Sequence, residues 1–403
     1  MYIFALLAAL LVLSHAVVIR RDDAFYTPDD GWKNKNPGDI LKWRKIKPQL
    51  LDQDVNVEEA YQVLYRTSHN HEDEPSHTVT TILVPHKAKK NKLVVGSTAQ
   101  DANGKQCTPS ASFTYASSEN LVLMVDKYLF MPYLQDGYIM TVPDKEGPMN
   151  SFAAGLMEGH MVLDSIRATL NFEKIGLSKD AEVAGYGYSG GAISLGWAAS
   201  LKGTYADELN VVGWAMGGTP VGLKETIDQM DGTPFAGLIV SGVAGVMDAY
   251  PGVKKEVEGH LTKEGKKAME FAHKNCLVGV LGKYMFKSIY NGELQDAGAE
   301  IFEGEEVKKA LRETHMGREN GPVPNAPVFM YHAKNDEVVP YKAARETAEM
   351  WCKKGAEVHM ETYTHIEHGH FTTEITGGMP AQRFVKERLE GREWNGKCEF
   401  KDK

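Results

Sequence analysis

The chain has 403 residues, with 45 basic against 54 acidic side chains and a formal net charge of −9. Hydrophobic residues make up 42% and charged residues 25%, and these ordinary globular values exclude a disordered or fibrous protein. The length allows one large α/β domain with an insertion, or two ordinary domains, and the acidic balance argues against nucleic acid as a partner.

The N-terminal segment, MYIFALLAALLVLSHAVVIRR, is apolar as far as Leu13 and is followed by the small residues Ser14 and Ala16. An apolar stretch of this length is short for a bilayer span, and small residues at its end are typical of a signal peptide cleavage site. We therefore expect residues 1–16 to be a signal peptide, with further processing at the dibasic site that ends at residue 21. An uncleaved anchor is the alternative.

Segments with strand character recur through the first half of the chain. They cover residues 77–84, 92–97, 138–142, 181–187 and 210–216. Helical patterns lie between the later segments, as in 151–170, where apolar residues recur on one face. Strands that alternate with helices predict βαβ units and a mostly parallel sheet. The first segment alternates polar and apolar residues, which is typical of a strand at an antiparallel edge.

The strand and helix alternation stops from about residue 221 to 316, where the pattern is largely helical. We therefore predict a helical insertion at 221–316 within an α/β core formed by 23–220 and 317–403. The later core resumes with strands at 326–333 and 357–363, separated by a helix that begins at Tyr341. A helical pattern at 379–391 follows them.

The stretch GYGYSGGAIS places Ser189 at the centre of a GxSxG motif, after a strand pattern and before a helical one. This is the setting of a nucleophile elbow, a tight turn that holds a serine in a strained backbone conformation. Gly187 and Gly191 meet the need for flanking positions without bulk. Ser189 is therefore a candidate nucleophile, and a plain serine in a glycine-rich turn is the alternative.

An elbow serine needs a base and an acid, which in this fold follow in the order Ser, Asp or Glu, His, each just past a strand. Asp336 follows the first of the later strands, with Glu337 as its neighbouring alternative. The loop after the next strand supplies three candidate bases: His365, His368 and His370. The same cluster could bind a metal, but its spacing misses HxxEH by one residue and no upstream cluster completes a ligand set.

Four cysteines occur without CxxC spacing. They are Cys107, Cys276, Cys352 and Cys398. In the oxidising environment of the secretory route an even number of scattered cysteines predicts two disulfides, with three pairings open. Four buried free thiols are the alternative.

Several ordered blocks resemble the fungal-type secretory lipases, which include the lipase A type of yeast. The similarity begins at 23–32 and 37–46 and is strongest in 137–168, 187–201 and 208–223. It implies an α/β-hydrolase core with a cap and lid at 221–316. It also implies a secreted triacylglycerol lipase that hydrolyses acylglycerol esters at an oil–water or membrane interface, with no metal or organic cofactor and no obligate protein partner.

The resemblance implies roles for individual residues, with Ser189 as nucleophile, Asp336 as acid and His370 as base, and His368 as the alternative base. It places Gly190 and Asp101 in the oxyanion hole. A carboxylate beside an oxyanion is repulsive, so Asp101 should be neutral or act through its N–H.

The resemblance also implies two disulfides, Cys107–Cys276 and Cys352–Cys398. An esterase, peptidase or acyltransferase on the same fold is the alternative function, because a triad does not fix the leaving group or the acyl acceptor. A catalytically inactive binding module is a second alternative, of a different class.

Overall fold

The computed structural model describes residues 23–50, 55–115, 121–394 and 396–403. The expected signal peptide at 1–16, and the processing site that ends at residue 21, lie outside the described residues. Within these ranges no helix combines the length and apolar character needed to cross a membrane.

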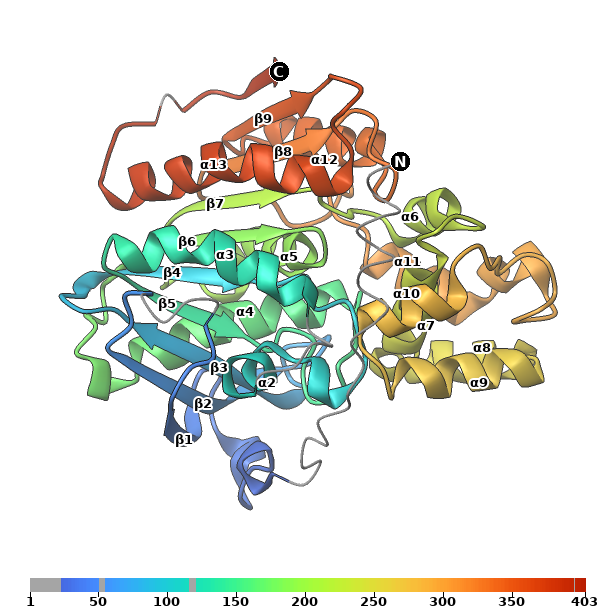
Figure 1. The fold of residues 1–403 in the computed structure, drawn as a ribbon, viewed down its shortest axis with the longest axis horizontal. Helices are drawn as coiled ribbons and strands as arrows, with labels where there is room; N and C mark the ends of the chain where they lie inside the picture. The colour runs from blue at the N-terminus through green and yellow to red at the C-terminus, as the bar shows by residue number, and fades with distance from the viewer. Residues whose placement is uncertain (1–22, 51–54, 116–120, 395) are drawn as a thin grey trace.

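One sheet of ten strands runs through the described chain, with helices against both faces (Figure 1). The strands lie in the order β1-β2-β3-β5-β4-β6-β7-β8-β9-β10. Their bounds are β1 Ile40–Ile46, β2 Glu59–Ser68, β3 Pro75–Val84, β4 Lys89–Ser97, β5 Tyr138–Pro143, β6 Glu182–Tyr188, β7 Val211–Gly217, β8 Val328–Ala333, β9 Val358–Tyr363 and β10 Glu399–Asp402. From β5 to β10 every neighbouring pair is parallel. The predicted mostly parallel α/β sheet is confirmed.

The predicted edge position of the 77–84 segment is wrong. This strand, β3, is antiparallel to β2 and to β5, but β2 and β1 both lie outside it. The two outer strands escaped prediction, in part because β2 buries polar side chains, Gln62 and Thr67, among its apolar ones. Buried polar residues blur the alternation by which a strand is recognised in sequence.

Helices cover the sheet in two layers. On one face lie α4 Gly155–Leu170, α5 Gly190–Tyr205 and α12 Tyr341–Lys353, and on the other lie α2 Pro109–Thr114, α3 Leu121–Gln135 and α13 His370–Leu389. Short 3-10 helices occur at Ala24–Tyr26, Trp32–Asn34, Lys105–Cys107, Glu173–Ile175 and Gly298–Glu303. Successive strand residues supply the two layers alternately, as when Val183 packs in the first and Ala184 in the second.

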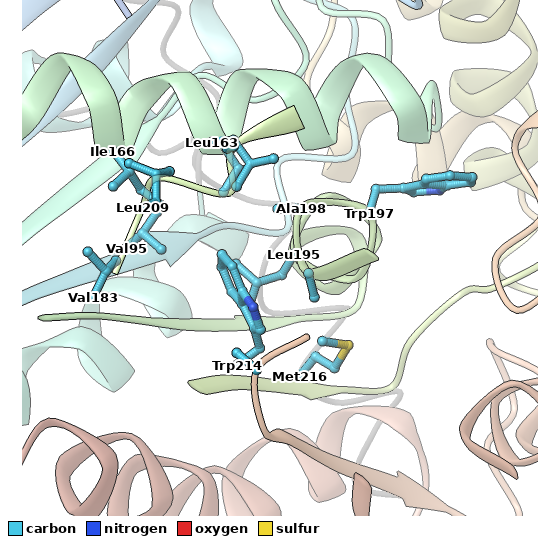
Figure 2. Close-up of a cluster of buried hydrophobic side chains, with 14 of the residues drawn as sticks. Val95, Leu163, Ile166, Val183, Leu195, Trp197, Ala198, Leu209, Trp214 and Met216 are labelled. Carbon is cyan, nitrogen blue, oxygen red and sulfur yellow. The ribbon is translucent and has the colours of Figure 1, made fainter. Parts of the chain in front are cut away.

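The first layer fixes α5 against β6 and β7 (Figure 2). Trp214 of β7 packs beside Leu195 of α5, and a Cβ on Gly185 of β6 would lie 2.4 Å from the Trp214 ring. On the outer side of α5, a Cβ on Gly155 of α4 would lie 2.1 Å from Trp197 Nε1. Glycines therefore let two large rings hold α5 closely between α4 and the sheet, which fixes the position of its N-terminus.

Two predicted helices have different bounds in the structure. The helix predicted at 151–170 begins at Gly155, and the helix predicted at 379–391 begins nine residues earlier, at His370. The second difference has a physical cause. Gly377, Gly378 and Pro380 all lie inside α13, and both residue types disfavour a helix in isolation. Packing against the sheet overrides that local preference.

Between β7 and β8 the described chain is helical and adds no strand to the sheet. The helices are α6 Leu223–Met230, α7 Ala236–Ala249, α8 Pro251–His260, α9 Lys263–Ala272, α10 Leu277–Tyr284 and α11 Glu305–Glu313. Their apolar side chains form two further clusters, one that includes Val240 and Val280 and one that includes Val253 and Val307. This insertion lies beside the carboxyl ends of the parallel strands (Figure 1), the edge at which open α/β sheets hold their ligands.

Two disulfides tie the insertion and the C-terminus to the core. Cys107, in the loop after β4, is bonded to Cys276 at the start of α10, and Cys352 of α12 is bonded to Cys398 just before β10. These are the pairs that the family resemblance implies.

Removing the longer cross-link should destabilise the protein more than removing the shorter one. The two bonds close loops of 169 and 46 residues. The chain-entropy relation then gives a loss of about 5 kcal/mol for the Cys107→Ser/Cys276→Ser variant and about 4 kcal/mol for the Cys352→Ser/Cys398→Ser variant. Unfolding midpoints in urea, compared with the parent, would test the order. A greater loss from the shorter loop would contradict this explanation.

Candidate active site

Ser189 lies between β6 and α5 in a strained backbone conformation. Its φ of 52° and ψ of −120° are unusual for a residue with a side chain, and its N–H donates to the Gly217 carbonyl at 2.9 Å. A Cβ on Gly191 would lie 2.3 Å from the Ser97 carbonyl oxygen, and a Cβ on Gly187 would lie 2.8 Å from the Gly191 oxygen. The two glycines of the motif are therefore steric requirements of the turn.

Three side chains that lie far apart in the sequence form a hydrogen-bonded chain. Ser189 Oγ lies 2.8 Å from His370 Nε2, and His370 Nδ1 lies 2.8 Å from Asp336 Oδ2. An ionised carboxylate only accepts hydrogen bonds, so Nδ1 carries the imidazole proton and Nε2 is left to accept the proton of the Ser189 hydroxyl. This arrangement can activate the serine as a nucleophile.

Asp336 is held in its ionised form. Its Oδ1 accepts the N–H groups of Val338 at 2.9 Å and Val339 at 2.7 Å, and His332 Nε2 lies 3.3 Å from Oδ2. Burial opposes ionisation, but the charges and hydrogen bonds of His370 and His332 prevail and hold the pKa of Asp336 well below its usual range. The neighbouring acid, Glu337, accepts the backbone N–H of His370 at 2.9 Å. This contact of Glu337 was not evident from the sequence.

His370 is the first residue of α13 and is almost fully buried. Besides its contact with Glu337, its carbonyl accepts the Tyr188 hydroxyl at 2.6 Å. Burial disfavours the charged imidazole, but the Asp336 carboxylate outweighs it and raises the pKa of His370 above its ordinary value. The backbone is thus fixed on both sides, which leaves the ring aimed at the serine.

The other two candidate bases do not join this chain of contacts. The His368 ring packs edge-on against Tyr363, with 5.1 Å between ring centroids. The centroids of the His368 and His365 rings are 6.3 Å apart. His365 Nδ1 lies 3.9 Å from a carboxylate oxygen of Glu367. Of the three histidines, it is His370 that the structure brings to Ser189.

The residues expected at the oxyanion hole meet beside the serine. Gly190 is the first residue of α5, where N–H groups have no carbonyl partner within the helix. A Cβ on Gly190 would lie 1.6 Å from Asp101 Oδ1, so the Asp101 carboxyl group lies directly over this glycine. The Asp101 N–H donates to Glu146 Oε1 at 3.1 Å, which leaves the side chain as the group that faces the site.

The charge state of Asp101 depends on its burial. Burial raises the pKa of Asp101 to about 6, against the opposing effects of the Lys145 and His370 charges. Its Oδ1 has no hydrogen-bond partner. A protonated Asp101 can therefore donate a hydrogen bond to an oxyanion at this point.

A buried charged cluster supports Asp101 from behind. Lys145 Nζ lies 3.1 Å from Glu146 Oε1 and 3.0 Å from Glu158 Oε2, and all three side chains are inaccessible to solvent. This cluster was not predicted from the sequence. Its signal was the DKEG segment directly after a buried strand, together with a glutamate on an otherwise apolar helix pattern.

An apolar pocket extends from the serine into the insertion. Ser189, Gly190 and Asp101 are part of its lining, together with Phe152 and Ile193. Most of the remaining wall is apolar and comes from the insertion. Residues of that wall include Ile227, Met230, Ile239, Val243, Val253, Met269, Phe302 and Val307. Such a lining suits a long hydrocarbon chain better than a polar substrate.

The sheet is mostly parallel and has helices on both faces, and the serine at the elbow is hydrogen-bonded to a histidine that is hydrogen-bonded to an aspartate. Together these features define an α/β-hydrolase. The secretory lipase family model matches residues 114–396. The chain therefore belongs to the secretory lipase family.

Individual relatives agree with this membership. The secreted triacylglycerol lipase LIP1 of Malassezia furfur is 55% identical over 389 residues, which cover 96% of this chain and 80% of the relative. The secreted triacylglycerol lipase LIP4 of Malassezia globosa is 43% identical over 382 residues, covering 95% and 84% of the two chains. Among solved structures, Candida antarctica lipase A in its closed state has a TM-score of 0.88 and 30% identity, covering 96% of this chain and 90% of that one.

Exchanging each acid for its amide should separate the roles of Asp336 and Glu337. Asp336→Asn removes the acceptor that fixes the His370 tautomer, and we expect kcat to fall by about 10⁴-fold. Glu337→Gln keeps an oxygen for the His370 N–H, so we expect a loss of no more than about tenfold. Steady-state hydrolysis of a soluble ester measures both.

His368→Gln is the matched control for the base and should retain the parent rate. Loss of activity in His368→Gln with survival in His370→Gln would contradict the assignment of His370.

Proposed function

We propose that this secreted enzyme is a triacylglycerol lipase that cleaves acylglycerol esters through an acyl-enzyme formed on Ser189. The observation that carries the proposal is the hydrogen-bonded chain of Ser189, His370 and Asp336, with Ser189 in the lining of an apolar pocket. The names of the Malassezia relatives support the same substrate class.

In the proposed mechanism, His370 Nε2 takes the Ser189 proton while the alkoxide attacks the ester carbonyl. The Gly190 N–H and the protonated Asp101 carboxyl donate to the developing oxyanion, and the N-terminal end of α5 adds a favourable dipole. His370 then protonates the leaving alcohol, and water repeats the sequence on the acyl-enzyme. The acyl chain would occupy the apolar pocket throughout.

We also propose the domain roles. Residues 221–316 act as a cap and lid over a hydrolase core formed by 23–220 and 317–403. The support is that helices of the cap supply most of the pocket wall, while the core supplies the reacting groups. Residues 1–16 are proposed as the signal peptide that directs secretion.

A substrate series with a Ser189→Ala control tests the reaction class. We expect the purified protein to hydrolyse emulsified long-chain triacylglycerol and a soluble short-chain ester, and to leave a peptide amide intact. Ser189→Ala should lose at least about 10⁴-fold in rate on both esters, because the nucleophile is gone. Cleavage of the soluble ester alone would replace the lipase assignment with a carboxylesterase. Unchanged activity in Ser189→Ala would overturn the mechanism.

The need for a protonated Asp101 should make kcat/KM depend on pH. Activity needs a deprotonated His370 and a protonated Asp101, and the pKa of Asp101 is raised to about 6 while that of His370 is raised above its ordinary value. Activity should therefore rise with pH on the acid side as His370 loses its proton, and fall on the alkaline side as the remaining protonated Asp101 is lost. Asp101→Asn keeps a donor at every pH, so its kcat/KM on a soluble ester should lose the fall on the alkaline side.

Asp101→Ala, which has no donor, should be slower by about 10²- to 10³-fold at the pH of the parent's maximum, and the difference should shrink on the alkaline side. An alkaline fall of the same size in Asp101→Asn as in the parent would show that another group causes it.

A further inference from the structure

Two helices beside the active site share an exposed apolar surface. On α3, Met124 is 44% and Tyr128 59% exposed, and on α13, Phe371 is 50%, Ile375 45% and Met379 64% exposed. The members of each set are four residues apart, so they lie on one side of their helix. We refer to these five side chains as the α3/α13 face.

The two helices pack side by side on the same face of the sheet (Figure 1). The Gln382 amide of α13 donates to the Leu129 carbonyl of α3 at 2.9 Å. A Cβ on Gly378 would lie 3.3 Å from the Leu129 side chain. Because the helices touch at these residues, the two exposed stripes flank one shared seam and form a single surface.

The face carries no exposed charge. Between residues 122 and 134 the charged residues are Asp126 and Lys127, and between 370 and 382 the charged carboxyl residue is Glu374. All three are buried, and the Lys127 ammonium donates to the Ser112 carbonyl at 2.8 Å. A quarter of the whole chain is charged, so a solvated helix pair of this length would be expected to expose several charges.

Charged side chains resume at the far end of the two helices. Lys386 of α13 pairs with Asp136, just after α3, at 2.5 Å, and Arg383 is exposed nearby in sequence. An apolar patch with a polar rim marks an interaction site on a protein surface.

The near end of the face adjoins the active site. Phe371 directly follows the proposed base, and its ring centroid lies 5.5 Å from that of His370 and 5.9 Å from that of Phe235, at the start of α7. Val122 of α3 packs in the same apolar cluster as Leu238, which lines the pocket. The face is therefore continuous with the apolar wall of the site.

We propose that the α3/α13 face is the surface on which the enzyme docks to an uncharged lipid phase, the surface of an acylglycerol droplet. This inference rests on the proposed lipase function and specifies how that site meets its substrate. An uncharged apolar face on a chain of net charge −9 favours a neutral lipid surface over an anionic one. Docking by this face would let an ester move from the lipid phase to the pocket along apolar surface.

The test uses the full-length secreted protein and compares its hydrolysis of an emulsion, which requires docking, with its hydrolysis of a soluble ester, which does not. The variant Ile375→Glu/Met379→Glu places two charges in the centre of the face, while Lys255→Glu on α8 changes the net charge by the same amount at an exposed site on the insertion. We expect Ile375→Glu/Met379→Glu to hydrolyse a soluble short-chain ester within about twofold of the parent. Hydrolysis of triolein emulsion at limiting surface area should fall at least about tenfold and recover as more surface is supplied.

Binding is measured separately by flotation with triolein droplets in the Ser189→Ala background, where no hydrolysis occurs. We expect Ser189→Ala alone, and with Lys255→Glu, to float with the droplets at low and at high salt, because apolar docking is not screened. Adding Ile375→Glu/Met379→Glu should abolish flotation. The proposal would be overturned if Ile375→Glu/Met379→Glu left flotation unchanged in the Ser189→Ala background and left the rate of emulsion hydrolysis unchanged in the active enzyme.

Three further outcomes keep the test decisive. If the glutamate variant loses soluble-ester activity, the neutral pair Ile375→Ser/Met379→Ser is used, and unchanged droplet binding by that folded variant would again overturn the proposal. If the parent sediments as a dimer that the variant loses, while droplet binding persists, the face belongs to a second copy and the proposal fails. A parent that cleaves only the soluble ester would refute the lipase function, whereas flotation of Ser189→Ala would still report on the face.

Discussion

The close approach of α5 to the end of β4 is the constraint on which the active site depends. The Ser97 carbonyl lies so near Gly191 that no side chain fits there, and the Ser97 and Ser194 hydroxyls are 2.6 Å apart in the same contact. This approach bends the chain sharply at Ser189 and accounts for its positive φ. It also sets the first N–H of α5 beside the loop that follows β4, where Asp101 lies. The proposed nucleophile and the proposed oxyanion groups therefore depend on the same packing contact, and a shift of α5 would disturb both.

The surroundings of Asp336 and Asp101 shift their pKa values in opposite directions. Asp336 receives two backbone N–H groups and faces two imidazoles, which favours its ionised form. Asp101 is buried with an unpaired oxygen, and two acids behind it, Glu146 and Glu158, share the single ammonium of Lys145. Burial raises the pKa of Glu146 to about 8 as well, so burial favours the protonated form of both Asp101 and Glu146. Pairs of carboxyl groups separated in this way are a recurrent means of placing an acid and a base in one site.

Sequence alone anticipated the features that follow from steric rules and chain order. The glycines around Ser189, and the loops that carry Asp336 and His370 after successive strands, are of this kind. It did not anticipate that α13 begins at His370, because the local residues disfavour a helix and the contacts that fix its start come from Glu337 and Tyr188. These contacts are tertiary.

The buried Lys145 cluster was missed for a related reason. Lysine and glutamate are read as solvent-facing residues, and only the fold shows that they compensate one another in the interior. The outer strands β1 and β2 were likewise hidden, in part because polar side chains of β2 are satisfied inside the protein, as when Gln62 donates to the Ser110 carbonyl at 2.7 Å.

Helix α13 joins the chemistry of the site to the surface of the protein. Its first residue is His370, its inner side packs Phe384 and Val385 into the core, and its outer side carries Ile375 and Met379. One helix therefore carries both the His370 imidazole and the side chains that would meet the lipid, with no loop between them. If the outer side meets lipid as we propose, the orientation of the enzyme on the droplet is set by the same helix that sets the position of His370, the proposed base. Docking and catalysis would then be coupled through geometry alone, with no conformational signal needed between the surface and the site.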